Sequence, residues 1–297
     1  MITQKKIIVT IPAHNEAKTI GPVIKGINKI MSESGYNYSI LVVNDGSNDE
    51  TALIAKKEGA IVVSHPYRSG LADTFRTEIK NCLELKADII VHIDADGQYL
   101  PRQIPLLLQE IDKGYDIALG SRFLGKIESM PFVKRLGNIA FSKVISRIVR
   151  YRITDCQTGF RAFTREVAEK IPIISNHTYT QEQIIHAIRQ KFRIKEVPVY
   201  FARRRGKSRL ISNPFEYAIK AWMNILRVYR DYEPLKFFGG SGLIMITLGS
   251  LLGLWFVYLH LTTGIKGHLG LIMLMLLLIL GGIQMLFFGF LADMNKK

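Results

Sequence analysis

The stretch Ile89-Ile90-Val91-His92-Ile93-Asp94-Ala95-Asp96-Gly97-Gln98 decides how the chain folds. Its first half is a short, mostly β-branched apolar run, which is typical of a buried parallel strand. Asp94 and Asp96 follow, two residues apart, where the backbone must turn. Mg²⁺ and Mn²⁺ prefer oxygen ligands, and two carboxylates at this spacing can reach one such ion. The stretch therefore predicts a metal site at the carboxyl end of a buried strand.

Segments of two kinds alternate on both sides of this stretch. Further strand-like runs occupy Ile7–Ile11, Ser39–Val43 and Ala60–Ser64. Helical patterns cover Ala17–Ser34, Glu50–Glu58, Gly70–Leu85 and Pro101–Lys113. Such alternation predicts an α/β fold in which helices cover both faces of a mostly parallel sheet. Ligands of such sheets bind at the carboxyl ends of the strands.

Two more strand ends carry acidic residues. Ile11-Pro12-Ala13-His14-Asn15-Glu16 ends the first strand, and Val42-Val43-Asn44-Asp45-Gly46-Ser47-Asn48-Asp49 ends the second. Glu16 and Asp45 suit the hydroxyls of a ribose or the edge of a base. The alternative is helix capping, because Asn15, Ser47 and Asp49 are good cap residues. For either segment taken alone, capping is the preferred interpretation.

The C-terminal part of the chain is apolar over two long stretches. Residues 237–265 carry no formal charge, and after Lys266 none appears until Asp293. Each stretch exceeds the roughly 20 residues that cross a bilayer. The predicted spans are Leu243–Leu261 and Leu269–Leu291, with close approach at Gly249, Gly253, Gly281 and Gly282. A buried hairpin of a soluble protein is the alternative, but such a helix is seldom uncharged on every face.

Charge predicts how these spans are oriented. Arg227, Arg230 and Lys236 precede the first span and Lys296 and Lys297 follow the second, whereas the connecting loop holds only Lys266. Lys and Arg favour the cytoplasmic side. We therefore expect an integral membrane protein whose two termini and catalytic domain are cytoplasmic, which agrees with an N-terminus lacking the apolar core of a signal peptide.

The segment Asn213–Tyr232 predicts an amphipathic helix in the membrane interface. One face carries its apolar residues: Phe215, Ala218, Ile219, Trp222, Ile225, Leu226 and Tyr229. An ordinary surface helix is the alternative.

The sequence thus predicts three parts. They are a cytosolic α/β domain in residues 1–210, an amphipathic interfacial helix in residues 211–235 and a two-helix transmembrane anchor in residues 236–297.

Composition fits a membrane protein better than a nucleic-acid-binding protein. The chain has 297 residues, a net charge of +15 and 48% hydrophobic residues. Basic residues gather before the apolar tail, where they can face anionic lipid. No recognisable nucleic-acid-binding module appears, so we expect no nucleic-acid partner. Cys82 and Cys156 have no metal-ligand spacing and are interpreted as reduced thiols.

Taken together, the three acidic strand ends resemble the family-2 glycosyltransferases with the GT-A fold. The resemblance continues through four later motifs: Gly120-Ser121-Arg122, Asp155-Cys156-Gln157-Thr158-Gly159-Phe160-Arg161, Glu196-Val197-Pro198-Val199, and Arg203 followed by Gly206-Lys207-Ser208. The set is similar to the branch that contains dolichol-phosphate mannose synthase and bacterial polyprenyl-phosphate glucosyltransferases. It spans roughly residues 7–210.

The resemblance implies a role for each matching position. The nucleotide sugar would contact Pro12, His14, Glu16, Val43, Asp45, Ala95 and Gln98, with Arg203 and Lys207 over the donor phosphates. Asp94, Asp96 and Gln98 would hold Mg²⁺ or Mn²⁺, and Arg122 and Arg135 the acceptor phosphate. Asp155 lies where other members keep an acceptor-side carboxylate. Two structural roles for Asp155, holding Arg161 or capping a turn, stay open beside the catalytic one.

The implied reaction moves a hexose from a UDP- or GDP-linked donor to a polyprenyl or dolichyl phosphate at the cytosolic membrane face, with inversion. Asn44 stands where many members have a second Asp, and Tyr67–Ala72 matches the usual glycine-rich stretch only loosely.

Two other functions stay open beside this reaction. A glycolipid or polysaccharide acceptor is one, although the Gln-x-x-Arg-Trp motif and extra spans of processive synthases are missing. A non-catalytic membrane binding protein is the other, and the intact acidic set argues against it. Homo-oligomer formation also stays open.

Overall fold

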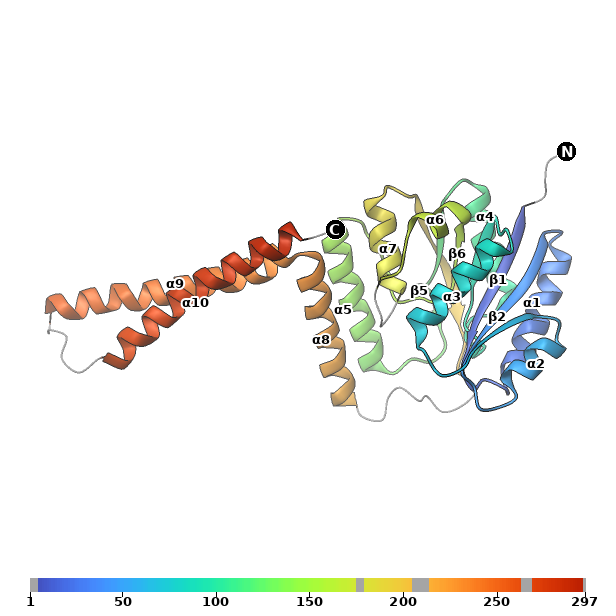
Figure 1. Ribbon diagram of the computed structural model, residues 1–297, viewed down its shortest axis with the longest axis horizontal. Helices are drawn as coiled ribbons and strands as arrows, with labels where there is room; N and C mark the ends of the chain where they lie inside the picture. The colour runs from blue at the N-terminus through green and yellow to red at the C-terminus, as the bar shows by residue number, and fades with distance from the viewer. Residues whose placement is uncertain (1–4, 175–178, 205–213, 263–268, 296–297) are drawn as a thin grey trace. The chain divides into compact units, whose positions relative to one another are not determined.

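The computed structural model describes residues 5–174, 179–204, 214–262 and 269–295 (Figure 1). The chain forms two compact units, Met1–Tyr217 and Ala218–Lys297. Each unit is described by itself.

The first unit is built on a seven-stranded sheet in the order β3-β2-β1-β4-β6-β5-β7. Its strands are β1 (Lys6–Ala13), β2 (Asn37–Asp45), β3 (Ile61–His65), β4 (Ile89–His92), β5 (Ile117–Ile127), β6 (Arg161–Thr164) and β7 (Ile194–Phe201). Strands β3, β2, β1 and β4 are parallel to one another, as are β5 and β7, while β6 is antiparallel to both of its neighbours. The predicted mostly parallel α/β sheet is confirmed.

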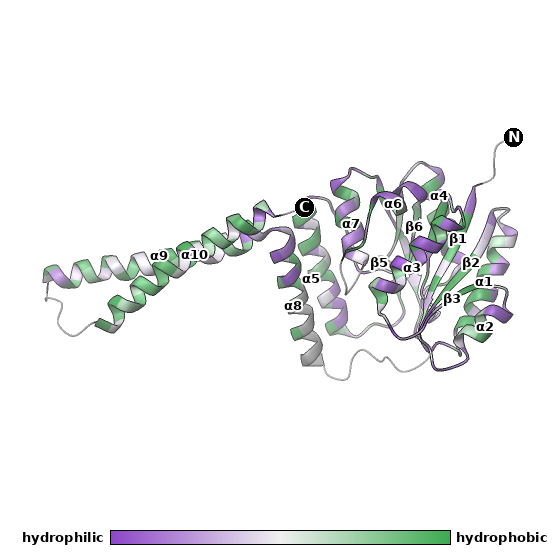
Figure 2. Ribbon diagram, viewed as in Figure 1, coloured by the Kyte–Doolittle hydropathy of each residue, from purple (hydrophilic) through white to green (hydrophobic). Residues whose placement is uncertain are grey.

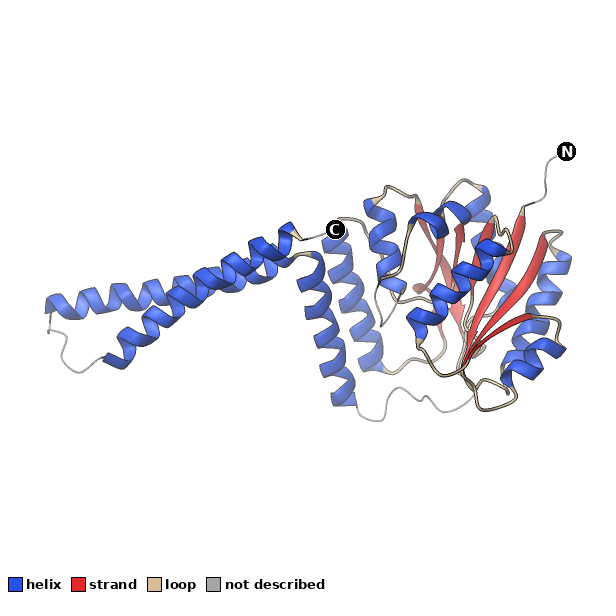
Figure 3. Ribbon diagram, viewed as in Figure 1, coloured by secondary structure: helices blue, strands red, loops and turns tan. Residues whose placement is uncertain are grey.

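Helices lie on both faces of this sheet (Figure 3). They are α1 (Ile20–Glu33), α2 (Thr51–Lys57), α3 (Leu71–Glu84), the short 3₁₀ turn η1 (Pro101–Gln103), α4 (Ile104–Asp112), α5 (Phe132–Val149), α6 (Arg165–Lys170) and α7 (Thr180–Arg189). The helix predicted from Ala17 begins at Ile20, with Thr19 as its N-cap.

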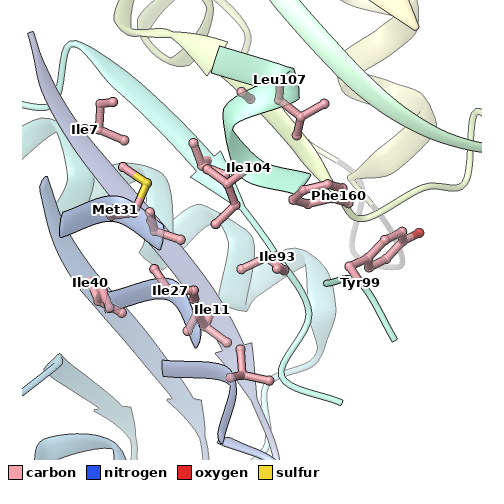
Figure 4. Close-up of a cluster of buried hydrophobic side chains, with 14 of the residues drawn as sticks. Ile7, Ile11, Ile27, Met31, Ile40, Ile93, Tyr99, Ile104, Leu107 and Phe160 are labelled. Atoms are coloured by element: carbon pink, nitrogen blue, oxygen red, sulfur yellow. The ribbon is translucent and has the colours of Figure 1, made fainter. Parts of the chain in front are cut away.

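The core fixes the strand ends that carry the acidic residues. Alternate residues of β1, among them Ile7 and Ile11, point to the same face and pack against Ile27 and Met31 of α1 (Figure 4). Burying each such side chain contributes about 1.5–3 kcal/mol. Because β1 pairs with β2 on one side and β4 on the other, the carboxyl ends of these three strands meet at one edge of the sheet.

The second unit contains most of α8 (Pro214–Tyr232), together with α9 (Pro234–Thr262) and α10 (Leu269–Met294). Helices α9 and α10 are long and apolar enough to cross a membrane, with mean hydropathies of 2.0 and 2.6 (Figure 2). In the most apolar 18-residue stretch of each helix, only 17% (α9) and 6% (α10) is buried, whereas a core helix of a soluble protein is mostly buried. These two apolar helices indicate membrane association. The interfacial position of α8 stays a prediction.

Glycines bring α9 and α10 into close contact, as predicted. A Cβ at Gly282 would lie 2.7 Å from the carbonyl oxygen of Gly242, and a Cβ at Gly249 would lie 2.7 Å from Ile279 Cγ1. Larger residues at these positions would force the two backbones apart.

Candidate active site

A pocket of about 390 Å³ lies at the carboxyl ends of β1, β2 and β4. Its walls are formed by Pro12, Ala13, His14, Glu16, Asp45, Arg68, Gly70, Leu71, Thr74, Asp94, Ala95, Asp96 and Arg204. A larger hollow of about 700 Å³ contains none of the predicted site residues and is lined by Lys5, Asp88 and Arg193 among others. It lies at the opposite edge of the sheet, so the smaller pocket is the candidate site.

The loops after β1 and β2 are tied together by their polar residues. Asn15 adopts a left-handed conformation with φ of 54°. Its N–H donates to Ser47 Oγ at 2.9 Å, and its side-chain oxygen accepts from Asn48 N–H at 2.8 Å. Asp49 accepts from the backbone N–H of Ala17 and Thr51. These side chains tie the two loops together, but they are not the helix caps considered in the sequence: the N-caps of α1 and α2 are Thr19 and Glu50, and neither makes a side-chain cap hydrogen bond. Glu16 and Asp45 line the pocket.

Asp45 is fixed in its position by three donors. Its Oδ1 accepts from His65 Nδ1 at 2.9 Å and from Ser69 N–H at 2.7 Å, and its Oδ2 accepts from Gly70 N–H at 3.0 Å. Burial raises the pKa of Asp45, but these hydrogen bonds outweigh it and hold the pKa below its ordinary value. The carboxylate is therefore ionised at neutral pH.

Asp94 and Asp96 place two carboxylates close together in the pocket. Burial and the nearby Asp94 charge raise the pKa of Asp96 to about 6. Asp94 packs against the backbone of Gly159, where a Cβ would lie 2.9 Å from its Oδ1. Gln98 donates its side-chain N–H to Ala202 O at 3.1 Å, which leaves its amide oxygen as a further acceptor. These oxygen donors fit Mg²⁺ or Mn²⁺.

Arg204 is a cation that contacts Glu16 and Asp96. Its Nη2 lies 3.0 Å from Glu16 Oε1 and its Nε lies 3.7 Å from Asp96 Oδ2. Within the described residues, no three His, Cys, Asp or Glu side chains form a ready metal cage. An ion held here would therefore take the carboxylates of Asp94 and Asp96, with the amide oxygen of Gln98 as a further ligand, and complete its shell with water or substrate oxygens, as Mg²⁺ commonly does.

Arg122 is held by a fork of charged hydrogen bonds near the pocket. Its Nε lies 2.7 Å from Asp155 Oδ2 and its Nη2 lies 2.8 Å from Asp155 Oδ1. Arg122 is 5% exposed and Asp155 is fully buried. A guanidinium has five N–H donors, and among the described residues the side-chain bonds of Arg122 use Nε and Nη2, so the Nη1 group can serve another acceptor. Glu196 accepts from Asp155 N–H at 3.0 Å and thereby fixes the loop that carries Asp155.

The family model for glycosyl transferase family 2 matches residues 8–172. The chain belongs to this family. An uncharacterized protein of Methanocaldococcus jannaschii is 40% identical over 67% of this chain and 82% of its own length. A dolichyl-phosphate hexose transferase of Haloferax volcanii is 31% identical, covering 74% and 92%.

A solved structure shows the same fold. It is glucosyl-3-phosphoglycerate synthase of Mycobacterium tuberculosis in complex with Mn²⁺ and UDP-glucose. Its TM-score is 0.59 at 20% identity, and the match covers 76% of this chain and 78% of that one. The GT-A type of fold expected from the sequence is therefore confirmed. The family match makes the chain a glycosyltransferase.

The structure brings together some of the residues expected in this glycosyltransferase site and not others. Pro12, His14, Glu16, Asp45 and Ala95 line the pocket. Val43 is fully buried within β2, so its side chain does not reach the pocket. Lys207 lies outside the described residues. Arg203 is exposed, and it is the neighbouring Arg204 that enters the pocket.

Asp155 has a different partner from the one considered in the sequence. It binds Arg122 rather than Arg161. Arg161 instead donates to Thr180 O at 3.1 Å and to Gln183 Oε1 at 2.9 Å. Because both oxygens of Asp155 are engaged and buried, the structure favours a positioning role over direct contact with substrate.

Lys134 was missed in the sequence, where the neighbouring Arg135 was expected to bind the acceptor phosphate. Burial lowers the pKa of Lys134, and the charge of Arg122 lowers it further. The negative charges of Asp96 and Asp94 act in the opposite direction and raise it. Arg135 is exposed. Helical periodicity was the available signal, because Lys134 shares a face with the buried Asn138 and Phe141.

Arg204→Gln is expected to strengthen Mn²⁺ binding to the donor-free protein by about fivefold, because a cation that competes for Glu16 and Asp96 is removed. Titration of the full chain with Mn²⁺, followed by electron paramagnetic resonance, measures this affinity. Arg203→Gln is the matched control and should leave it unchanged. Equal affinities in Arg204→Gln and the wild type would show that Arg204 does not compete with the ion.

Proposed function

We propose that this glycosyltransferase moves a hexose from a nucleotide diphosphate sugar to a polyprenyl or dolichyl phosphate. One observation carries the acceptor assignment: Arg122, which is buried, and Lys134, which is half-buried, are two cations near the acidic residues, and the charge of Arg122 adds to burial in lowering the pKa of Lys134. A dianionic headgroup suits such a pair, because Arg grips phosphate oxygens with its planar fork. The relatives support this acceptor, since one is a UDP-N-acetylglucosamine–dolichyl-phosphate N-acetylglucosaminyltransferase of Methanococcus voltae, 30% identical over 67% of this chain.

In the proposed reaction, an acceptor phosphate oxygen attacks the anomeric carbon while the bond to the donor diphosphate breaks. The acceptor is already ionised at neutral pH, so no strong general base is needed. Arg122 and Lys134 hold the attacking phosphate in line, which inverts the anomeric centre. Asp94, Asp96 and Gln98 would hold Mg²⁺ or Mn²⁺, which would supply Lewis-acid stabilisation of the leaving diphosphate.

Two further residues assist without bonding to the sugar. Arg204 turns from Glu16 and Asp96 toward the donor diphosphate when the donor binds. Asp155 is a positioning residue that presents the free Nη1 edge of Arg122 to the acceptor phosphate. This assignment replaces the catalytic role considered for Asp155 in the sequence.

We further propose that α9 and α10 span the bilayer with both chain termini and the catalytic unit on the cytoplasmic side. The distribution of Lys and Arg around the two spans supports this orientation. A long isoprenoid cannot leave the bilayer cheaply, so its phosphate must be met at the interface. A membrane-anchored catalytic unit fits that requirement.

The reaction is tested with the purified full chain, Mn²⁺, a short polyprenyl phosphate and a panel of UDP- and GDP-hexoses, with mass spectrometry of the lipid fraction. Formation of a lipid-linked hexose from one donor is the expected result. Hydrolysis of a donor without lipid product would point to a glycolipid or polysaccharide acceptor. No turnover of any donor would contradict the proposed activity.

Lys134→Met is expected to raise the KM for the polyprenyl phosphate by about tenfold or more, because a charge-assisted contact to phosphate is lost. Arg135→Met is the matched control, and its exposed side chain predicts a change below about twofold. Initial rates at varied acceptor concentration measure both. A larger effect in Arg135→Met than in Lys134→Met would return the second phosphate contact to Arg135.

A further inference from the structure

A buried pair of ionisable side chains, one of them two residues before Asp94, takes no part in the proposed reaction. Glu78 of α3 and His92 of β4 are both fully buried, and Glu78 Oε2 lies 3.2 Å from His92 Nε2. Within the part of the chain that the structure describes, neither oxygen of Glu78 has a well-directed hydrogen bond, so the contact with His92 is close but poorly aligned. Burying two such groups together is costly, and the pair therefore calls for a function.

The other ring nitrogen of His92 holds the backbone of Gly159. Nδ1 lies 2.8 Å from Gly159 O, and because a carbonyl oxygen only accepts, Nδ1 must carry the proton of this bond. A second proton, on Nε2 or on Glu78, keeps two lone pairs from facing each other at 3.2 Å. The rings of Phe75 and Tyr179 pack against the imidazole at centroid distances of 5.6 Å and 5.1 Å. His92 is therefore fixed in one orientation toward Gly159.

The register of the sheet explains why a side chain is needed at this point. Strands β4 and β6 are antiparallel, and their ladder ends with the pair His92 and Arg161. Two residues further along each strand, the same register sets Asp94 opposite Gly159, beyond the ladder. The bond from His92 to Gly159 O therefore holds the chain where strand pairing has ended. A Cβ at Gly159 would lie 2.9 Å and 3.0 Å from the two carboxylate oxygens of Asp94, so the carboxylate rests against this backbone.

We propose that Glu78 and His92 are positioning residues of the metal site, because they fix the Gly159 backbone against which the Asp94 carboxylate is oriented. The inference rests on the proposed function, which places Asp94 among the ligands of Mg²⁺ or Mn²⁺. Without the His92 donor, the buried Gly159 oxygen would lose its partner, and the loop would no longer hold Asp94 in one orientation. Removing groups that orient metal ligands from outside the coordination shell commonly weakens metal binding by about 10- to 100-fold.

The test measures Mn²⁺ affinity by electron paramagnetic resonance, and folding stability by pulse proteolysis, in variants of the full chain. Glu78→Leu combined with His92→Leu replaces the buried pair by apolar side chains, which should keep most of the stability. Its Mn²⁺ affinity is expected to fall by about tenfold, because Gly159 O has lost its donor. Unchanged affinity would overturn the positioning role and leave the metal site standing. Absence of Mn²⁺ binding in the wild type would instead overturn the metal site of the proposed function itself.

Three further variants separate positioning from packing. His92→Gln keeps an N–H donor for Gly159 O, so its Mn²⁺ affinity should stay within about threefold of the wild type. Gly159→Ala leaves Glu78 and His92 in place but presses a methyl group against Asp94, so a loss of about tenfold is expected. Phe75→Leu is the control, because it loosens the packing around His92 and keeps the donor, and affinity should hold within about twofold. A fall in Phe75→Leu as large as in the double variant would show that affinity follows stability, and would overturn the proposal.

Discussion

Asp96→Asn is expected to lower sugar transfer by at least about a thousandfold. The asparagine fills the same volume but removes one of the two negative charges that would hold the divalent ion. Asp94 alone would bind the ion weakly, so the leaving diphosphate would lose its charge stabilisation. Turnover at saturating donor and acceptor measures the loss, and Mn²⁺ titration of the same variant shows whether ion binding falls with it.

Asp112→Asn is a suitable control for this substitution. Asp112 is a partly exposed carboxylate outside the pocket that pairs with Lys5 at 3.1 Å. Its replacement should leave turnover within about twofold, since surface ion pairs contribute little. Wild-type turnover and Mn²⁺ affinity in Asp96→Asn would remove Asp96 from the metal site and, with it, the proposed source of Lewis-acid assistance.

The strand ends of this site could be predicted from the sequence because they depend on local patterns. Apolar runs with β-branched residues define β1, β2 and β4, and the carboxyl ends of parallel strands meet at one edge. Glu16 lies three residues after β1, Asp45 is the last residue of β2 and Asp94 lies two residues after β4, so all three line one pocket. Val43 lies two residues before Asp45 in β2, and its side chain is buried in the core instead of facing the pocket.

The basic residues of the site were harder to predict. Their positions depend on which way a helix or loop turns each side chain, and on ion pairs between residues far apart in the sequence. Lys134 and Arg135 are adjacent, and only the phase of α5 decides which of them faces inward. Arg204 follows the end of β7 at Phe201, where the two-residue period of a strand no longer applies. Asp155 lies between α5 and β6, whereas its partner Arg122 lies on β5, and no local spacing indicates that pairing.

Asp155→Asn is expected to destabilise the catalytic unit by about 3–5 kcal/mol. The substitution would leave the Arg122 guanidinium, which is 5% exposed, without its counter-charge. Pulse proteolysis of the full chain in urea measures the change, since cleavage then reports the unfolded fraction. The same variant should lose most of its sugar transfer, because Arg122 is no longer held in one orientation toward the acceptor phosphate.

A second variant separates stability from function. Asp155→Asn combined with Arg122→Met removes both buried charges, so most of the lost stability should return. Sugar transfer should stay low in this double variant, because the guanidinium that grips the acceptor phosphate is missing. If Asp155→Asn alone kept its stability and lost only turnover, Asp155 would have to act on the reacting groups directly. A stability gain without activity in the double variant would instead establish that Asp155 acts through Arg122, and that the buried fork exists to orient one phosphate-binding edge.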